Sequence, residues 1–107
     1  MRTKSPAALY AALGDETRLQ LVARLSGGLS LSITSLTEGT RLTRQSVTKH
    51  LRMMEGSGLL RRRRQGRESH YQLNPQRIEE ARRHLETISM QWDAALLRLK
   101  DFVEKDI

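Results

Sequence analysis

The last third of this 107-residue chain contains neither glycine nor proline after Pro75. Asn74 and Pro75 are typical of a helix start, because a capping side chain precedes proline at the first helical position. A helix over about residues 75–105 would be roughly 45 Å long at 1.5 Å per residue. A chain of this size builds one modest core, so an apolar face left over along this helix indicates a partner subunit.

The apolar residues of this segment recur every seven residues in two registers. They are Ile78, Leu85, Trp92 and Leu99 in the first register, and Ala81, Ile88, Ala95 and Phe102 in the second. The repeat predicts a continuous packing surface. This surface either covers the core of its own chain or joins two copies. We favour a symmetric dimer, because the surface is long and its aromatic side chains lie far from the preceding elements.

Two short helices joined by a tight turn are predicted at about residues 32–57. Ser32 caps the first helix and Thr43 caps the second, and glycines follow each of them. The second helix is amphipathic, with Val47, Leu51 and Met54 on its inner face. Helix, turn and amphipathic helix together are typical of a helix-turn-helix.

Residues 59–73 change to the period of a β-hairpin. A turn at residues 65–66 would place Leu60 opposite Tyr71 and Arg63 opposite Glu68. The chain is therefore predicted to be a mainly α, single-domain protein over residues 1–107. We expect a winged helix-turn-helix with a two-stranded β-hairpin wing and a long C-terminal dimerisation helix.

Positive charge is concentrated in residues 41–67. This stretch holds nine of the 19 lysines and arginines but only one of the 12 acidic residues, so its net charge is +8 and that of the remainder is −1. A charge cluster is often only a solvated face. Confinement to a quarter of the chain instead favours contact with a polyanion such as double-stranded DNA.

Helical geometry assigns roles within this stretch. At 100° per residue, Gln45, Lys49 and Arg52 point away from the core, with Thr48 on the flank. Arginine and glutamine pair bidentately with base edges in the major groove. The candidates to read bases or anchor the groove are Arg44, Gln45, Thr48, Lys49 and Arg52. The candidates to hold phosphates from the wing are Arg62, Arg64 and Arg67.

Other function classes find no support. The chain has no cysteine, which excludes a disulfide framework, a thiolate metal site and a catalytic thiol. Its three histidines are dispersed, and no phosphate-binding glycine loop or serine elbow occurs, so we predict no enzyme, metal or cofactor. We found no signal peptide and no apolar stretch of membrane-spanning length, and therefore expect a cytoplasmic protein without membrane contact.

Five motifs resemble, in order, the ArsR family of bacterial winged-helix repressors. They are LGDETRL at 13–19, LTRQSVTKHL at 42–51, GLL at 58–60, GRE at 66–68 and YQL at 71–73. The resemblance implies a homodimer joined by the first and last helices. The interface residues it indicates are Leu9, Leu13, Ile78, Leu85, Ile88, Trp92, Leu99 and Phe102. The positions that the family uses against DNA are Thr43, Arg44, Thr48 and His50.

Two departures limit what the resemblance transfers. Metal-sensing members carry Cys-x-Cys where this chain has Ser30, Ser32 and Ser35, so the thiolate sensor is absent. Arg44 stands where the family commonly has glutamine, and Gln45 where proline is frequent, so no operator preference is carried over. The long last helix resembles the metal-independent, autorepressor-like branch.

The resulting prediction is a homodimeric, sequence-specific transcriptional regulator that represses from a pseudo-palindromic operator. Three alternatives stay open. The C-terminal surface could bind a foreign helix in a partner-controlled interaction module. The charge could serve nonspecific DNA binding. A small-molecule effector could occupy the dimer interface.

Overall fold

The computed structural model describes residues 5–105. Four helices precede the hairpin: α1 (Pro6–Leu13), α2 (Glu16–Arg24), α3 (Ile33–Thr37) and α4 (Arg44–Gly56). Each begins directly after a side chain that accepts a hydrogen bond from a main-chain N–H of the first turn, which satisfies one of the unpaired donors there. These caps are Ser5, Asp15, Ser32 and Thr43. The structure thus confirms the predicted caps Ser32 and Thr43.

The predicted two-stranded hairpin wing is present, and a third strand that the sequence did not predict extends its sheet. Strand β2 (Leu60–Gln65) and strand β3 (Glu68–Leu73) form the hairpin, and the two-residue strand β1 (Leu31–Ser32) pairs antiparallel with β3. A short 3-10 helix, η1 (Ser26–Gly28), leads into β1. The third strand ties the base of the wing to the start of α3.

The hairpin register differs from the sequence prediction by two residues. The expected pairs, Leu60 with Tyr71 and Arg63 with Glu68, are wrong. The observed pairs include Leu60 with Leu73, Arg62 with Tyr71, Arg63 with His70 and Gln65 with Glu68. The favourable cross-strand ion pair expected for Arg63 is therefore replaced by a contact within β3, where His70 Nε2 lies 3.2 Å from Glu68 Oε2.

The turn explains this difference. Its two central residues are Gly66 and Arg67, and Gly66 has φ +60°. Glycine with positive φ at the first central position, followed by a residue of ordinary φ, is typical of a type II′ turn. A shift of two residues leaves every side chain on its predicted face, so Arg62 and Arg64 still share one face.

The core lies between α1, α2, α3, α4 and the base of the hairpin. Its largest fully buried side chains include Leu21, Leu25, Leu36, Val47, Leu51, Met54, Leu59 and Tyr71. Leu9 belongs to this core with 0% of its surface exposed. The placement of Leu9 in a dimer interface is therefore corrected, because its side chain has no surface left for a partner. Leu13 packs partly buried against the same core.

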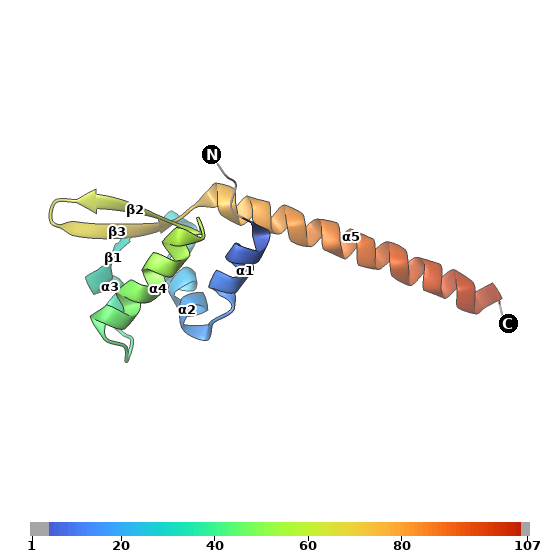
Figure 1. Cartoon of the computed structure of the whole chain (residues 1–107), viewed down its shortest axis with the longest axis horizontal. Coiled ribbons are helices and arrows are strands. Elements are labelled where there is room, and N and C mark those ends of the chain that lie inside the picture. The colour runs from blue at the N-terminus through green and yellow to red at the C-terminus, as the bar shows by residue number, and fades with distance from the viewer. Residues whose placement is uncertain (1–4, 106–107) are drawn as a thin grey trace.

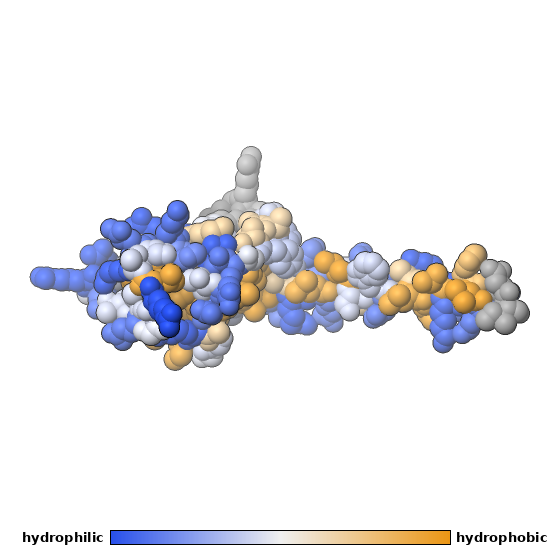
Figure 2. Space-filling model, turned by 90° about the horizontal axis from the view of Figure 1, so that it is seen from below, coloured by the Kyte–Doolittle hydropathy of each residue, from blue (hydrophilic) through white to orange (hydrophobic). Residues whose placement is uncertain are grey.

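Helix α5 (Pro75–Lys105) leaves this body on the side opposite the hairpin tip (Figure 1). It gives the molecule its 69 Å longest dimension. Figure 2 shows apolar side chains recurring along α5 while the visible face of the body is largely hydrophilic. None of the helices within residues 5–105 is long and apolar enough to cross a membrane.

A buried arginine joins the start of α5 to the body. Arg77 is only 6% exposed. Its guanidinium donates to the main-chain oxygen of Ser57 at 3.1 Å, to the main-chain oxygen of Ser5 at 2.7 Å and to Glu80 at 2.7 Å. These contacts bridge the end of α4, the cap of α1 and the first turns of α5. Arg77 therefore fixes the direction in which α5 leaves the body.

Candidate nucleic-acid interface

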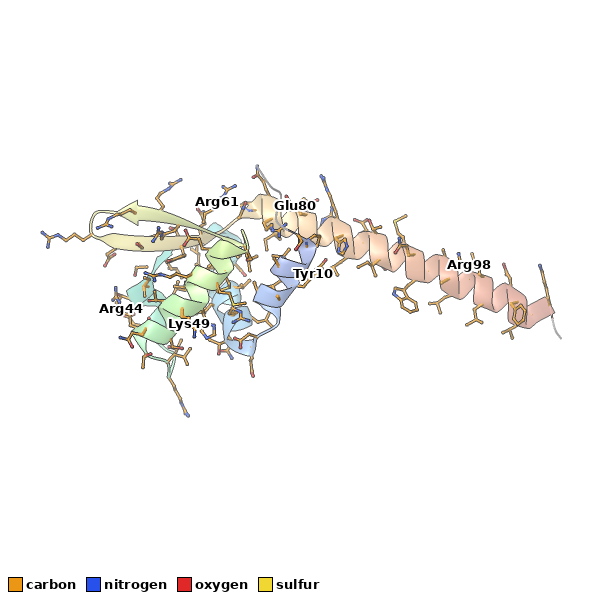
Figure 3. All side chains as sticks on the ribbon, in the orientation of Figure 1. Tyr10, Arg44, Lys49, Arg61, Glu80 and Arg98 are labelled. Atoms are coloured by element: carbon orange, nitrogen blue, oxygen red, sulfur yellow. The ribbon has the colours of Figure 1, made fainter. Side chains whose placement is uncertain are left out.

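The outer face of α4 is polar and cationic. Gln45, Lys49 and Arg52 are exposed, whereas Val47, Leu51 and Met54 on the inner face are fully buried. A shallow hollow runs over the outer face, lined by Arg44, Gln45, Thr48, Lys49 and Arg52. Figure 3 shows Arg44 and Lys49 along this helix. Five of the residues predicted to read bases or anchor the groove are therefore adjacent.

Arg44 is held by two neighbours. Its Nη1 donates to Thr34 Oγ1 of α3 at 2.8 Å, and its main-chain oxygen accepts from Thr48 Oγ1 at 2.8 Å. The second bond uses the only proton of the Thr48 hydroxyl, so in this conformation Thr48 has no hydroxyl proton left for a phosphate. Thr48 therefore lies at the predicted place, but its hydroxyl donates to a main-chain oxygen of its own helix.

Thr43 and His50 differ in what they offer to a ligand. Thr43 Oγ1 accepts from the main-chain N–H of Ser46 at 3.1 Å, which leaves the hydroxyl proton available for a phosphate. His50 is half-buried, and its Nδ1 lies 3.2 Å from Nη1 of Arg18 on α2. His50 thus faces α2, away from the outer face of α4.

The wing arginines lie where alternation places them. Arg62 and Arg64 share the hairpin face with Tyr71, and Arg62 Nε lies 3.6 Å from Glu55 Oε2 of α4. This half-exposed ion pair contributes at most about 1 kcal/mol to stability, but it keeps Arg62 close to α4. Arg64 Nε donates to the main-chain oxygen of Gly66 at 3.3 Å. Arg67 is exposed at the turn.

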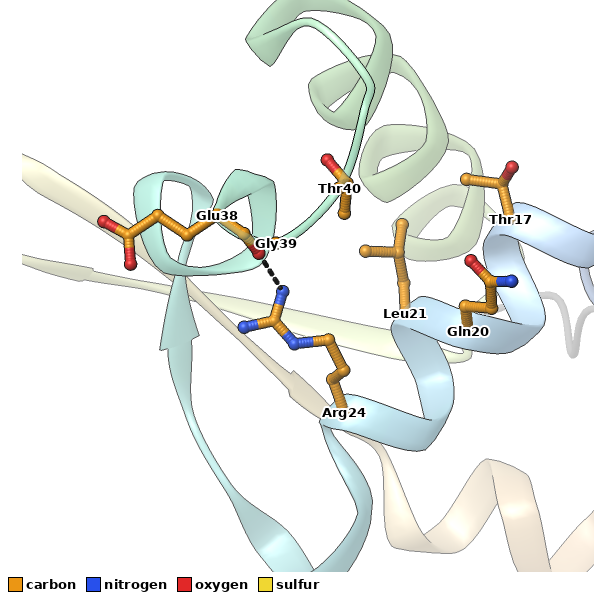
Figure 4. Close-up of a pocket in the computed structure, with 7 residues that line it drawn as sticks. All are labelled: Thr17, Gln20, Leu21, Arg24, Glu38, Gly39 and Thr40. Carbon is orange, nitrogen blue, oxygen red and sulfur yellow. Dashed lines mark hydrogen bonds between the residues drawn. The ribbon is translucent and has the colours of Figure 1, made fainter.

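Two arginines outside the basic stretch cap helix ends. Arg18 donates to the main-chain oxygens of Ala11 and Ala12, at the end of α1. Arg24 donates to those of Ser35, Leu36 and Glu38, at the end of α3. Figure 4 shows Arg24 directed at the main-chain oxygen of Glu38 while the Glu38 carboxylate points elsewhere. Unpaired carbonyl groups at helix ends favour nearby cations. The guanidinium groups of Arg18 and Arg24 therefore stabilise the fold.

The shifted pKa values follow from local contacts. The main-chain N–H of Arg18 lowers the pKa of Asp15, the cap of α2. The hydrogen bond from Arg82 lowers the pKa of Glu79 to about 2. Burial raises the pKa of Tyr71. Within residues 5–105, none of the groups with a resolved shift lies on the outer face of α4.

The apolar side of α5 forms a second exposed surface. Trp92 is 64% exposed and Phe102 is 67% exposed, although both are large apolar side chains. Ile78, Leu85 and Leu99 of the same heptad pattern are also exposed, and Ile88 is half-buried. Exposed apolar surfaces of this extent are typical of interaction sites.

Comparison with known proteins agrees with this arrangement. A helix-turn-helix domain family matches residues 13–63. Over 70 residues the chain is 37% identical to the arsenical resistance operon repressor of Escherichia coli strain K12, an alignment that covers 65% of this chain and 60% of that repressor. An ArsR-like transcriptional regulator from Rhodococcus sp. RHA1 is 32% identical, with a TM-score of 0.79 and coverage of 91% of each chain. The chain belongs to the ArsR family.

This ArsR protein also resembles the transcriptional repressor PagR of Bacillus anthracis, with 32% identity, a TM-score of 0.57, and coverage of 64% of this chain and 77% of PagR. The curated arsenical repressor is matched over less than two thirds of its own length. Membership of this family confirms the prediction of a winged helix-turn-helix regulator. The family consists of transcriptional regulators and not of enzymes.

Ser32 and Ser35, two of the three serines named above in place of the sensor cysteines, have structural roles in this ArsR protein. Ser32 caps α3 through the main-chain N–H of Ser35, and the two hydroxyl oxygens lie 3.1 Å apart. Among residues 5–105, no three histidine, aspartate or glutamate side chains lie close enough together to hold a metal ion. The polar side chains at this end of α3 therefore serve the helix start.

Proposed function

We propose that this ArsR protein is a homodimeric transcriptional repressor that recognises a pseudo-palindromic operator. Each subunit would place α4 in a major groove and lay the wing against the adjacent backbone. The observation that carries this proposal is a difference between cations of the body and cations of α4. Arg18, Arg24 and Arg77 bond to main-chain oxygens within the fold, whereas Lys49 and Arg52 are exposed on the outer face of α4. Together with the exposed wing arginines Arg62, Arg64 and Arg67, they give α4 and the wing a cationic surface.

A second copy of the chain is the proposed occupant of the α5 surface. Its large apolar side chains are exposed in a single chain, so burying them against a partner is favourable. Their seven-residue repeat suits packing against a second helix with the same repeat. Two identical subunits would present two α4 helices related by a two-fold axis. Half-sites about one DNA turn apart, roughly 10 bp, follow from that symmetry.

Within the proposed DNA face, each residue has a distinct role. Gln45 and Arg44 would pair with base edges. The residues proposed to hold α4 in the major groove are Thr43, Lys49 and Arg52. Arg67 would contact a phosphate from the wing. Because His50 contacts Arg18, we assign it a positioning role rather than a DNA contact. Arg62 and Arg64 stay on the α4 side of the wing as phosphate contacts.

Replacing Arg67 with alanine is expected to weaken binding to all duplexes equally. A phosphate contact carries no sequence information, and each lost contact reduces the slope of log K against log salt by about 0.9. The measurement is a salt titration of binding to an operator duplex and a scrambled duplex. Arg63→Ala serves as the control, because Arg63 is an exposed wing arginine on the face opposite Arg62 and Arg64, and it should leave the slope unchanged. An unaltered slope for Arg67→Ala would remove its phosphate contact from the proposal.

Replacing Gln45 with alanine is expected to change which base is preferred. Loss of one bidentate base contact removes about 1–3 kcal/mol of discrimination at a single operator position. The measurement is competitive binding with operators substituted at each position. Gln20→Ala, the same change at an exposed position of α2, is the control. Equal weakening on every operator variant would instead assign Gln45 to the DNA backbone.

A further inference from the structure

The hydroxyl of Thr34 lies on α3 beside the base-reading helix. It accepts a hydrogen bond from Nη1 of Arg44 at 2.8 Å, although the two residues belong to different helices. Arg44 is the first residue of α4, so its backbone position is set by the Thr43 cap. A long arginine side chain at an exposed site otherwise samples many rotamers, at a cost of up to about 2 kcal/mol when it is fixed.

We propose that Thr34 is a specificity-determining positioning residue, which pre-orients the Arg44 guanidinium for reading a guanine. This inference rests on the proposed DNA-binding function and adds to it a residue outside α4. Thr34 acts through Arg44 and has no base contact of its own.

The hydrogen-bond chemistry of the guanidinium is compatible with both contacts. Arginine has five N–H donors in a planar fork, and the bond to Thr34 uses one of them. A second N–H on Nη1 and those on Nη2 remain for the O6 and N7 acceptors of guanine. Thr34 as an acceptor therefore anchors one nitrogen of the fork and leaves four N–H groups for a base.

The surroundings restrict Arg44 further. A shallow hollow between α3 and α4 is lined by Thr34, Thr37, Glu38 and Arg44. The main-chain oxygen of Arg44 accepts from Thr48 Oγ1. Both ends of the residue are thus held before DNA arrives, which lowers the entropy lost on binding. The interaction therefore favours one orientation of the guanidinium over others.

The test is selection of bound duplexes from a random pool with the full chain and its variants. Thr34→Val, with Thr34→Ala as a second variant, should reduce discrimination about three- to tenfold at the operator position where Arg44→Ala also loses it. Thr34→Ser keeps the hydroxyl and should restore the preference. Thr37→Val is the matched control and should leave the preference unchanged. Valine keeps the shape that threonine gives to the hollow, and the hydroxyl it removes donates to the main-chain oxygen of Ile33 within α3.

The double variant separates a positioning role from a structural one. In the Arg44→Ala background, Thr34→Val should change neither the selected motif nor the affinity. Thr34 variants that select the wild-type motif, or that weaken all duplexes equally, would overturn the inference and leave the proposed repressor standing. An Arg44→Ala variant with an unchanged motif would also overturn it. A wild-type chain that selects no motif would refute the proposed function itself.

Discussion

Replacing Trp92 with glutamate is expected to convert the proposed dimer into monomers and to weaken operator binding by about 10²- to 10⁴-fold. Trp92 lies midway along the apolar side of α5 and is 64% exposed in one subunit. A carboxylate there would have to be desolvated in the interface without a partner. Because dimerisation turns the second half-site contact into an intramolecular event, its loss removes that advantage for DNA binding.

Met90→Glu is the matched control for this experiment. Met90 is 66% exposed on the same helix, but at 100° per residue its direction differs from that of Trp92 by about 160°, so it lies on nearly the opposite side. Sedimentation should give a monomer for the Trp92 variant and a dimer for the Met90 variant. A dimeric Trp92→Glu protein that binds its operator like the wild type would disprove the assignment of this face.

Replacing Arg77 with alanine is expected to reduce the free energy of unfolding by about 2–4 kcal/mol. The change removes the guanidinium that donates to the main-chain oxygens of Ser57 and Ser5, and it frees the start of α5 from the body. The Ser5 oxygen keeps the N–H of Ala8 as a donor. For a domain of this size each kcal/mol corresponds to a decrease in Tm of roughly 4–8 °C. Urea unfolding at one fixed protein concentration measures the effect, since dimerisation adds to the apparent stability.

Arg83→Ala is the comparison for Arg77. Arg83 is on the same helix with its side chain 75% exposed, and its ion pair with Glu79 is at the surface, so its loss should cost less than about 1 kcal/mol. Similar unfolding free energies for the two variants would show that Arg77 does not anchor α5. A change in the preferred distance between operator half-sites in the Arg77 variant would further link the direction of α5 to the spacing of the two α4 helices.

Features determined by neighbouring residues could be predicted from the sequence. The caps Ser32 and Thr43 act on N–H groups three residues ahead, so their pattern is visible locally. The heptad repeat likewise identified the apolar side of α5. The hairpin faces were correct for the same reason, because side chains in a strand alternate with a period of two.

Features that depend on distant main-chain atoms were missed. Arg77 and Ser5 are 72 residues apart, and carbonyl acceptors leave no pattern in a sequence. One signal existed: Arg77 lies four residues before Ala81, on the side of α5 that is otherwise apolar, where an arginine must find partners. The placement of Leu9 in the interface failed because an apolar side chain in α1 suits the core and a partner equally well. The hairpin register depended on the φ of Gly66, which a glycine in sequence leaves undefined.

Sequence-specific recognition by the outer face of α4 is tested most directly by selecting duplexes from a random pool with the purified wild-type chain. The expected result is one enriched pseudo-palindrome whose two half-sites lie about 10 bp apart, bound by one dimer. Enrichment of no motif, or of a single unpaired half-site, would contradict the proposal.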